Sequence, residues 1–394
     1  MREAVIVSAC RTPVARAGPK SYFRNVRADD LSIIVIKELL RRTKIDPKTI
    51  EDVIWGCAMT TNEQGMNIAR MIGLMAGLPV EVAGMTIDRF CASSLQAINS
   101  AAQAVMTGCG DIIIAGGGEN MTQVPMGTNA KPNPKIYQAV DASSFFMGQT
   151  AENLSDKYKE FTREEIDKFA LRSHQKAVAA QREGKLKKEI VPVEGILEDG
   201  TKALIDTDQH PRPDTSLEKL SNLKLAFRPP GTGTVTAGNS SGLNDNASGV
   251  VVMSKEKAKE LGLRPLCTIR AMAVVGVPPE IMGIGPVYAI PKVLKRAGMK
   301  LEDIDIFEIN EAFAVQVLVC IKELGLEKAL EEDRINPNGG AVAIGHPLGA
   351  TGARIMCTLL YEMERRNARW GLETMCVGMG QGAATIVERE DYNW

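Results

Sequence analysis

An internal repeat is the feature that most constrains the fold. The stretch "LLRRTKIDPKTIEDVIWG" (Leu39–Gly56) resembles "VLKRAGMKLEDIDIFEIN" (Val293–Asn310), and each reads as a helix end, a basic pair, a turn, an acidic pair and a strand. Farther along, "IDRFCASSLQAI" corresponds to "AIGHPLGATGARIM", and "DIIIAGGGEN" to "TMCVGMGQGA", in the same order. Ordered self-similarity predicts a duplicated unit. We therefore expect two similar domains, residues 1–118 plus 247–270 and residues 271–394.

Short runs rich in Val and Ile alternate with amphipathic stretches, which is typical of α/β layering. The expected strands are Ala4–Ala9, Asp52–Cys57, Met85–Ile87, Asp111–Ala115, Gly249–Met253, Thr268–Val274, Asp303–Ile309, Thr374–Gly378 and Ala383–Val387. The expected helices are Leu31–Arg42, Asn67–Ala76, Ala92–Thr107, Pro286–Ala297, Ala312–Leu324 and Thr351–Asn367.

The segment between the two halves, residues 119–246, has a different composition. It is rich in Pro, Gly, Asn and Lys, and it contains two expected helices, Thr150–Tyr158 and Arg163–Glu183. Long insertions commonly cover an active site or contact a partner. The alternative is a solvent-exposed segment with neither role.

Charge and cysteine usage exclude several classes of function. The 394 residues carry 47 basic and 48 acidic side chains, so the net charge of −1 provides no bulk attraction for nucleic acid or an anionic membrane. No apolar run reaches the ~18 residues of a membrane span, and the N-terminus enters a strand without a secretory h-region. The eight cysteines show no metal-ligand spacing, so we expect free thiols, no metal and a cytoplasmic location.

Cys91 stands where an apolar run ends and a small-residue helix begins. At a helix N-terminus a thiol meets unpaired N–H groups and the positive end of the helix dipole, which favour the thiolate. Serine, asparagine or aspartate is the usual cap at such a position. Cys91 is therefore a candidate nucleophile, and a small buried hydrophobe is the alternative.

His346 lies in the glycine-rich stretch "NPNGGAVAIGHPLGATGAR". Of the three histidines, His174 falls on a helical stripe and His210 in a polar loop, so His346 alone sits where backbone can approach a ligand closely. A nucleophilic cysteine needs such a base. A loop histidine with a structural hydrogen bond is the alternative.

Cys376 and Asn310 each end an apolar strand of the second half. Cys376 begins "CVGMGQG", where it could shuttle a proton and nearby N–H groups could bind an oxyanion, although a core position is the alternative. Asn310, in "INEAFA", could hold a water or a carbonyl, or could cap the following helix. The repeat puts Cys91 and Cys376 at comparable levels of two related sheets, where both could face one pocket.

Taken together, these motifs resemble the thiolase family over essentially the whole chain. The resemblance rests on "DRFCASSLQAI", "MGQTAEN", "TVTAGNSSGLND", "EINEAFA", "NPNGGAVAIGHPLGATGAR" and "CVGMGQG", all in family order. It implies an α/β thiolase fold, in which two duplicated α/β domains form a five-layered α/β/α/β/α core and residues 119–246 form a loop domain for coenzyme A (CoA) and oligomer contacts. It also implies a homodimer or homotetramer, with residues 121–134 as a possible tetramer contact.

The resemblance implies a role for each matching residue. Cys91 matches the acyl-carrying nucleophile, His346 the base that activates it, and Cys376 the acid/base at the acetyl C2. Asn310 matches the residue whose water forms one oxyanion hole with His346, and the N–H groups of Cys91 and Gly378 match a second. CoA and acyl contacts are implied for Arg212, Ser241, Met147, Phe313 and Ala237. CoA would be a substrate, and no permanently bound cofactor is expected.

Three positions depart from common family patterns. Asp88 stands three residues before Cys91, where asparagine is common, and Ser94 replaces a glycine found in many members. Phe146 precedes "MGQTAEN", where acetoacetyl-specific members typically carry histidine. Phe146 therefore favours a general 3-ketoacyl-CoA thiolase acting in fatty acid β-oxidation.

The implied activity is thiolytic cleavage of a 3-ketoacyl-CoA and the reverse Claisen condensation, by ping-pong kinetics through an acyl-cysteine. One alternative is an acetoacetyl-CoA-specific acetyl-CoA acetyltransferase. A ketoacyl-synthase type of condensing enzyme would need a second histidine in a glycine-rich setting. A non-catalytic acyl-CoA-binding protein is the remaining alternative, and the intact set of four polar residues argues against it.

Overall fold

A computed structural model of the chain describes residues 2–390. Its main sheet has the strand order β10-β11-β12-β9-β1-β8-β5-β3-β4, and the short β2 pairs with β8 beside that path. The strands of this sheet are β1 (Ala4–Arg11), β2 (Ala15–Arg16), β3 (Asp52–Gly56), β4 (Ala83–Ile87), β5 (Ile112–Asn120), β8 (Asn244–Ser254), β9 (Cys267–Gly276), β10 (Ile306–Ile309), β11 (Trp370–Val377) and β12 (Gln381–Glu388).

The strand pairing repeats in the two halves and confirms the predicted duplication. In the first half β3 pairs in parallel with β5, then β5 pairs antiparallel with β8, and β8 with β1. In the second half β10 pairs in parallel with β11, then β11 pairs antiparallel with β12, and β12 with β9. Within the main sheet, the strand pairing between the halves runs through β1 and β9, where Val5 pairs with Thr268 and Ile6 with Cys267.

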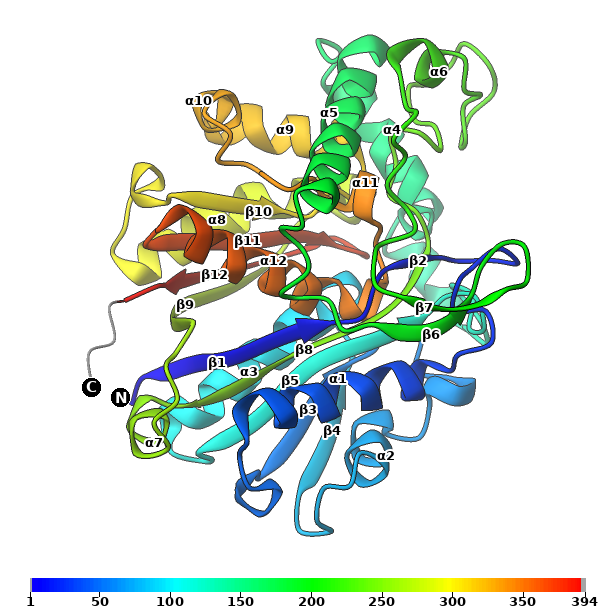
Figure 1. The fold of residues 1–394 in the computed structure, drawn as a ribbon. Helices are drawn as coiled ribbons and strands as arrows, with labels where there is room; N and C mark the ends of the chain where they lie inside the picture. The colour runs from blue at the N-terminus through cyan, green and yellow to red at the C-terminus, as the bar shows by residue number, and fades with distance from the viewer. Residues whose placement is uncertain (1, 391–394) are drawn as a thin grey trace.

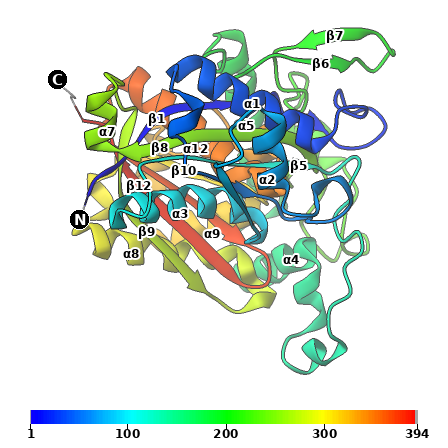
Figure 2. The same ribbon diagram turned by 90° about the horizontal axis from the view of Figure 1, so that it is seen from below.

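Helices lie on both faces of each half and between the halves. Figure 2 shows the layer order: α1, the strands β1 and β8, α3, the strands β12 and β9, and α8. The helices that form the layers are α1 (Ala28–Thr43), α2 (Ile68–Met75), α3 (Ser93–Thr107), α8 (Gly285–Ala297), α9 (Ala314–Leu324) and α12 (Thr351–Arg366). The predicted five-layered α/β/α/β/α architecture is therefore confirmed.

Three hydrophobic cores hold these layers together. One packs α1 and α2 against the outer face of the first half, and another packs α8 and α9 against the outer face of the second half. The central core contains side chains of α3 and α12 with strands from both halves. Burying apolar area on both faces of both sheets is the main stabilising contribution to a fold of this type. As a result, α3 and α12 begin close together in the interior.

The segment between the halves carries its own helices and a hairpin. They are α4 (Met147–Lys157), α5 (Arg163–Arg182), α6 (Leu217–Ser221), and the two-stranded sheet of β6 (Val193–Ile196) and β7 (Lys202–Ile205). In Figure 1 the helices α4 and α5 lie beside α9, and α6 lies farther out, packed against α5. A Thr162–Glu165 capping box begins α5, as the sequence "FTREEID" favours.

The structure differs from the expected elements in a few places. The strand expected from Asp303 begins at Ile306, because Leu301–Asp303 form a 3₁₀ turn. The boundary placed at residue 270 falls inside β9, which pairs mainly with β12. The β6–β7 hairpin and the short helices α7 (Lys255–Glu260), α10 (Glu327–Glu331) and α11 (Ala341–Ile344) were not expected. Within residues 2–390, no helix combines the length and apolarity that crossing a bilayer requires.

Candidate active site

Cys91 lies in a tight turn directly before α3. The turn, Phe90–Ala92, is a 3₁₀ helix, and Phe90 adopts φ +44°, which is uncommon for a bulky residue. Side chains hold the turn: Asp88 Oδ1 accepts from the Phe90 N–H at 2.8 Å, and Ser93 Oγ accepts from the Arg89 N–H at 2.9 Å. Cys91 is thereby fixed at the start of the helix, as the sequence predicts.

Opposing influences act on the Cys91 thiol. Burial raises its pKa to about 11, while the backbone N–H groups of Gly378 and of Cys91 itself act to lower it. Glu119 and Asp88 raise it further through their negative charges. Because both N–H groups interact with the sulfur, the structure brings Gly378 and Cys91 together, although their role in binding an oxyanion stays a prediction.

A largely apolar pocket of about 660 Å³ opens beside Cys91. Gly378 and Met147 contribute to its wall, as does the exposed Asp88. Its other lining residues include Ala58, Met59, Thr60, Thr61, Phe90, Met126, Gly127, Thr128, Asn129, Ala130, Lys131, Pro132, Phe145, Leu348 and Met379. A mostly apolar pocket with one reactive group and a few polar side chains is typical of a substrate site.

His346 is held in the loop that leads into α12. Its backbone N–H donates to Asn244 Oδ1 at 2.9 Å, and its ring Nδ1 lies 2.7 Å from Thr351 Oγ1. The ring Nε2 is buried without a hydrogen-bond partner. Burial, assisted by the charge of Arg354, lowers the pKa of His346 to about 3. The ring is therefore neutral at neutral pH and has one free nitrogen, as a proton acceptor requires.

Asn310 and Cys376 are both buried near the ends of strands in the second half. Asn310 follows β10, and its backbone N–H donates to Thr374 O at 2.9 Å while both polar atoms of its amide lack partners. Burial raises the pKa of Cys376 well above its usual value, and the nearby Cys91 raises it further. The two thiols therefore lie close enough to interact, as the repeat predicts.

Three predicted segments meet beside these residues. Isolated β-bridges connect Ser240 with Phe313 and Leu243 with His346, and the Ser241 N–H donates to Ala312 O at 2.9 Å. The motifs "TVTAGNSSGLND", "EINEAFA" and "NPNGGAVAIGHPLGATGAR" are therefore adjacent in space. Phe313 is buried, and its ring packs edge-on against Phe227 with centroids 6.3 Å apart.

The predicted CoA contacts do not all lie at the pocket. Arg212 is exposed, and it lines a separate hollow of about 170 Å³ with His174, Arg182 and Thr215. Ala237 is also exposed. Of the predicted site residues that the structure describes, Cys91, Gly378 and Met147 line the pocket beside the thiol, while His346, Asn310 and Cys376 are buried and do not line it.

Glu119 is a structural residue of the site that the sequence analysis did not single out. It is fully buried at the end of β5, and its carboxylate accepts from the N–H groups of Ala58 at 2.8 Å and Gly349 at 2.9 Å and from Gln64 Nε2 at 2.6 Å. It thus ties the loop that follows His346 to the first half, next to the pocket. The signal was available in "GGGEN", an acid directly after an apolar strand.

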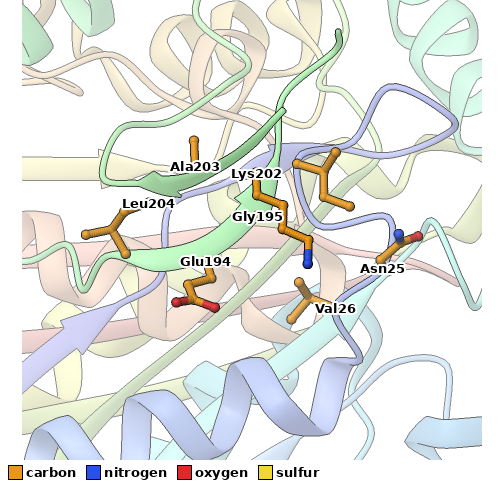
Figure 3. Close-up of a pocket in the computed structure, with 8 residues that line it drawn as sticks. Asn25, Val26, Glu194, Gly195, Lys202, Ala203 and Leu204 are labelled. Carbon is orange, nitrogen blue, oxygen red and sulfur yellow. The ribbon is translucent and has the colours of Figure 1, made fainter. Parts of the chain in front are cut away.

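A second hollow, of about 490 Å³, lies away from the thiols between the β6–β7 hairpin and the chain before α1. Figure 3 shows that Asn25, Val26, Glu194, Lys202 and Leu204 contribute to its wall. Its lining offers one carboxylate and one ammonium but no thiol, and none of the predicted site residues lines it.

Comparison with known families agrees with this geometry. The model of the thiolase N-terminal domain matches residues 4–256, and the model of the thiolase C-terminal domain matches residues 263–389. The chain belongs to the thiolase family. This thiolase-family protein is 50% identical over 389 residues to the 3-ketoacyl-CoA thiolase of Marinobacter nauticus, covering 98% of each chain. It is also 50% identical over 390 residues to that of Aeromonas hydrophila, covering 99% of this chain and 100% of the relative.

Solved structures show the same likeness. The Bacillus anthracis acetyl-CoA acetyltransferase superposes on this thiolase-family protein with a TM-score of 0.88 and 41% identity, covering 98% of this chain and 99% of the other. Human mitochondrial 3-ketoacyl-CoA thiolase superposes with a TM-score of 0.89 and 36% identity, covering 99% of each chain. The predicted family is therefore confirmed.

Proposed function

We propose that this protein is a 3-ketoacyl-CoA thiolase, which cleaves a 3-ketoacyl-CoA with free CoA into acetyl-CoA and a shortened acyl-CoA. The observation that carries the proposal is the placement of Cys91 at the start of α3, in the wall of an apolar pocket and facing the N–H of Gly378. The names of the full-length relatives at 50% identity support the same activity.

In the first half-reaction, His346 accepts the proton of Cys91, and the thiolate attacks the 3-keto carbon. The C2–C3 bond then breaks, and its electron pair leaves as the enolate of acetyl-CoA. Cys376 donates a proton to C2, which releases acetyl-CoA and leaves the acyl group on Cys91. In the second half-reaction, the Cys376 thiolate takes the proton of the CoA thiol, and the CoA sulfur attacks the thioester carbonyl. The C–S bond to Cys91 then breaks, and the departing Cys91 thiolate recovers its proton from His346. Two half-reactions through one covalent intermediate predict ping-pong kinetics.

Two separate sets of donors are proposed for the two anions. The N–H groups of Cys91 and Gly378 would stabilise the tetrahedral oxyanion at the acyl-cysteine. His346, together with a water held by the unpartnered amide of Asn310, would stabilise the enolate oxygen. One oxyanion donor commonly contributes about 3 kcal/mol to transition-state stabilisation, so loss of either set would be severe.

For the substrate we propose a CoA thioester with a straight apolar acyl chain. Met147 and the other apolar side chains of the pocket support this choice, and Phe313 would contribute from the adjacent segment. Ser241 and Ala237 would lie along the pantetheine arm and Arg212 near the adenine end. CoA is consumed as a substrate, and the proposed steps require neither a metal nor a redox cofactor.

The alternative is an acetoacetyl-CoA-specific acetyltransferase. The structural similarity to the Bacillus anthracis acetyl-CoA acetyltransferase supports this alternative. That protein, however, is 41% identical in sequence, whereas the 3-ketoacyl-CoA thiolase of Marinobacter nauticus is 50% identical. Phe146, where histidine would indicate the acetoacetyl-specific class, is exposed beside the start of α4.

We further propose a cytoplasmic homodimer or homotetramer. The strand β4 is an edge of the main sheet, and exposed apolar side chains gather on it and on and after α2: Leu74, Met75, Val80 and Met85. An edge strand with apolar neighbours is a ready site for a second copy of the chain. Sedimentation equilibrium would measure the number of copies directly.

The deciding experiment is kcat/KM for thiolysis across a series from acetoacetyl-CoA to long-chain 3-ketoacyl-CoA. We expect a broad preference for the longer substrates and loss of activity in Cys91→Ser. A steep preference for acetoacetyl-CoA would support the alternative instead. Full thiolysis by Cys91→Ser would overturn the assigned nucleophile.

A further inference from the structure

Three ionisable side chains are buried on adjacent elements of the interior and have few partners. Glu308 on β10 is 2% exposed, Glu373 on β11 is fully buried, and Arg354 on α12 is 1% exposed. Five of their polar atoms make no hydrogen bond: Glu308 Oε1, both carboxylate oxygens of Glu373, and Nε and Nη1 of Arg354. Buried polar groups are nearly always hydrogen-bonded, so this cluster requires a physical explanation.

The strand register places the two carboxyl groups side by side. Glu308 and Glu373 are direct partners in the parallel pairing of β10 with β11, so their side chains point to the same face of the sheet. That face is the one covered by α12, because Ile306 and Met375, each two residues away, pack in the central core with side chains of α12. Both carboxyl groups therefore lie on the face covered by α12, the helix that carries Arg354, and the charge of Arg354 acts on each of them.

We propose that Glu308 and Glu373 share one retained proton at neutral pH, so that their cluster with Arg354 is electrically neutral, and that the cluster acts as a positioning group for His346. Two adjacent buried carboxylates cannot both ionise against a single cation without a large electrostatic penalty. Burial raises the pKa of both carboxyl groups well above the usual range, and Arg354 opposes that rise in each case.

Other charged groups near the cluster already have partners of their own. Glu362 bonds to Arg365 and Arg366, Glu311 to Ser173 and Asn336, Lys176 to Asp333, and Arg11 to Glu189 and Asp208. The charges of Glu362, Glu311 and Lys176 interact with Glu308, and the charge of Arg11 interacts with Arg354. Arg354 is the cation that acts on both Glu308 and Glu373.

The connection to His346 runs through the first turn of α12. Thr351 bonds to the His346 ring at 2.7 Å, and Arg354 follows on the same helix one turn later. The charge of Arg354 acts on His346 in addition to burial. A neutral cluster limits that influence, so the ring can still accept a proton. This consequence for His346 rests on the proposed function, whereas the shared proton does not.

Infrared difference spectroscopy on the full chain at pH 8 tests whether Glu308 and Glu373 share a proton. We expect Glu308→Gln and Glu373→Gln each to remove one protonated-carboxyl band, and the double variant to remove that same single band. Glu364→Gln, an exposed carboxyl on the same helix, is the control and should remove none. No band lost in either single variant, or two bands lost in the double variant, would overturn the shared proton.

The effect on His346 is tested by the pH dependence of kcat/KM. Arg354→Met should move the acid limb to higher pH by about half a unit or more, because a nearby positive charge is removed, and Arg354→Lys should restore most of it. Glu373→Gln leaves Glu308 ionised, so the net charge of the cluster with Arg354 is unchanged and the acid limb should stay in place. An unchanged acid limb in Arg354→Met would overturn the positioning role while leaving both the infrared result and the proposed thiolysis intact.

Discussion

At the scale of single residues, the turn around Cys91 explains why an acid is tolerated at position 88. The Asp88 carboxylate accepts the Phe90 N–H, and this bond stabilises the left-handed conformation of Phe90. An asparagine oxygen could make the same bond, so the difference lies in the charge. Asp88 adds a negative charge near the thiol and disfavours its ionisation. The carboxylate therefore lowers the reactivity of the resting nucleophile.

Replacing this charge should make Cys91 more reactive. We expect Asp88→Asn to keep the turn, lower the pKa of Cys91 and raise its rate of alkylation by iodoacetamide by about threefold at pH 8. Asp46→Asn is the matched control, because Asp46 also accepts an N–H two residues ahead, at Lys48, but does not line the pocket. An equal or slower rate in Asp88→Asn would contradict the electrostatic interpretation.

The bond between Thr351 and His346 gives a second prediction for a single side chain. Thr351→Val keeps the shape but removes the hydroxyl 2.7 Å from Nδ1, so the ring loses its fixed orientation. We expect kcat for thiolysis to fall by roughly tenfold to a hundredfold with little change in KM, since the loss is in proton transfer. Thr351→Ser should recover most of the activity. Wild-type kcat in the valine variant would exclude this role.

At the scale of elements, the two central helices stabilise each other at their N-termini. Ser94 Oγ, in the first turn of α3, accepts from the Ala353 N–H of α12 at 2.9 Å, while the residue preceding α12, Ala350, has no capping side chain. A Cβ at Gly56 would overlap the Ser94 backbone, so α3 packs unusually close to the end of β3. Ser94, a residue of the first half, therefore caps the N-terminus of α12 in the second half.

Removing this cap should destabilise the fold modestly. We expect Ser94→Ala to lower the free energy of unfolding by about 1 kcal/mol, because a buried N–H loses its partner. Ser100→Ala, farther along the same helix, is the control and should change it by only a few tenths of a kcal/mol. Urea unfolding followed by circular dichroism measures both. Equal stability of the two variants would show that Ser94 contributes nothing as a cap.

At the scale of the whole molecule, the three histidines make stability depend on acid. Burial lowers the pKa of His174 to about 4 and that of His210 and His346 to about 3. Below pH 6.5 the unfolded chain binds protons that the folded chain does not. The contribution of the neutral histidines to the free energy of unfolding is therefore fully present above pH 6.5. It is lost as the pH falls toward their pKa values in the folded protein, by about 1.4 kcal/mol per pH unit for each histidine.

His210 allows this slope to be tested away from the thiols. Between pH 6 and pH 4, His210→Gln should reduce the slope of unfolding free energy against pH by about one proton, or about 1.4 kcal/mol per pH unit. Denaturant unfolding at several pH values gives the slope. An unchanged slope would mean that His210 titrates equally in both states, despite its burial.

Much of the architecture could be predicted because the signals are local. The alternation of apolar runs and amphipathic stretches located the long helices and central strands, since each must bury one or both faces. The β6–β7 hairpin was missed because each of its strands is only four residues long, too short to show a clear apolar period. Cys91 and His346 were recognised from unusual residue types at a helix start and in a glycine-rich loop. Glu119 could have been noticed as an acid at the end of an apolar run, but its hydrogen-bond donors at Ala58, Gln64 and Gly349 are distant in the chain, so its structural role was not predictable.

By itself, the sequence determined the duplication, the family and the residues able to do the chemistry, because repeats, motifs and residue types are written in the order of the chain. Only the tertiary structure decided the charge state and surroundings of those residues. Packing of the Phe90–Ala92 turn against the end of β11 places Cys91, Cys376 and the N–H of Gly378 together. The register of β10 with β11 sets Glu308 beside Glu373. Burial and charge act through space, so residues far apart in the chain determine how each thiol, carboxyl and imidazole holds its proton.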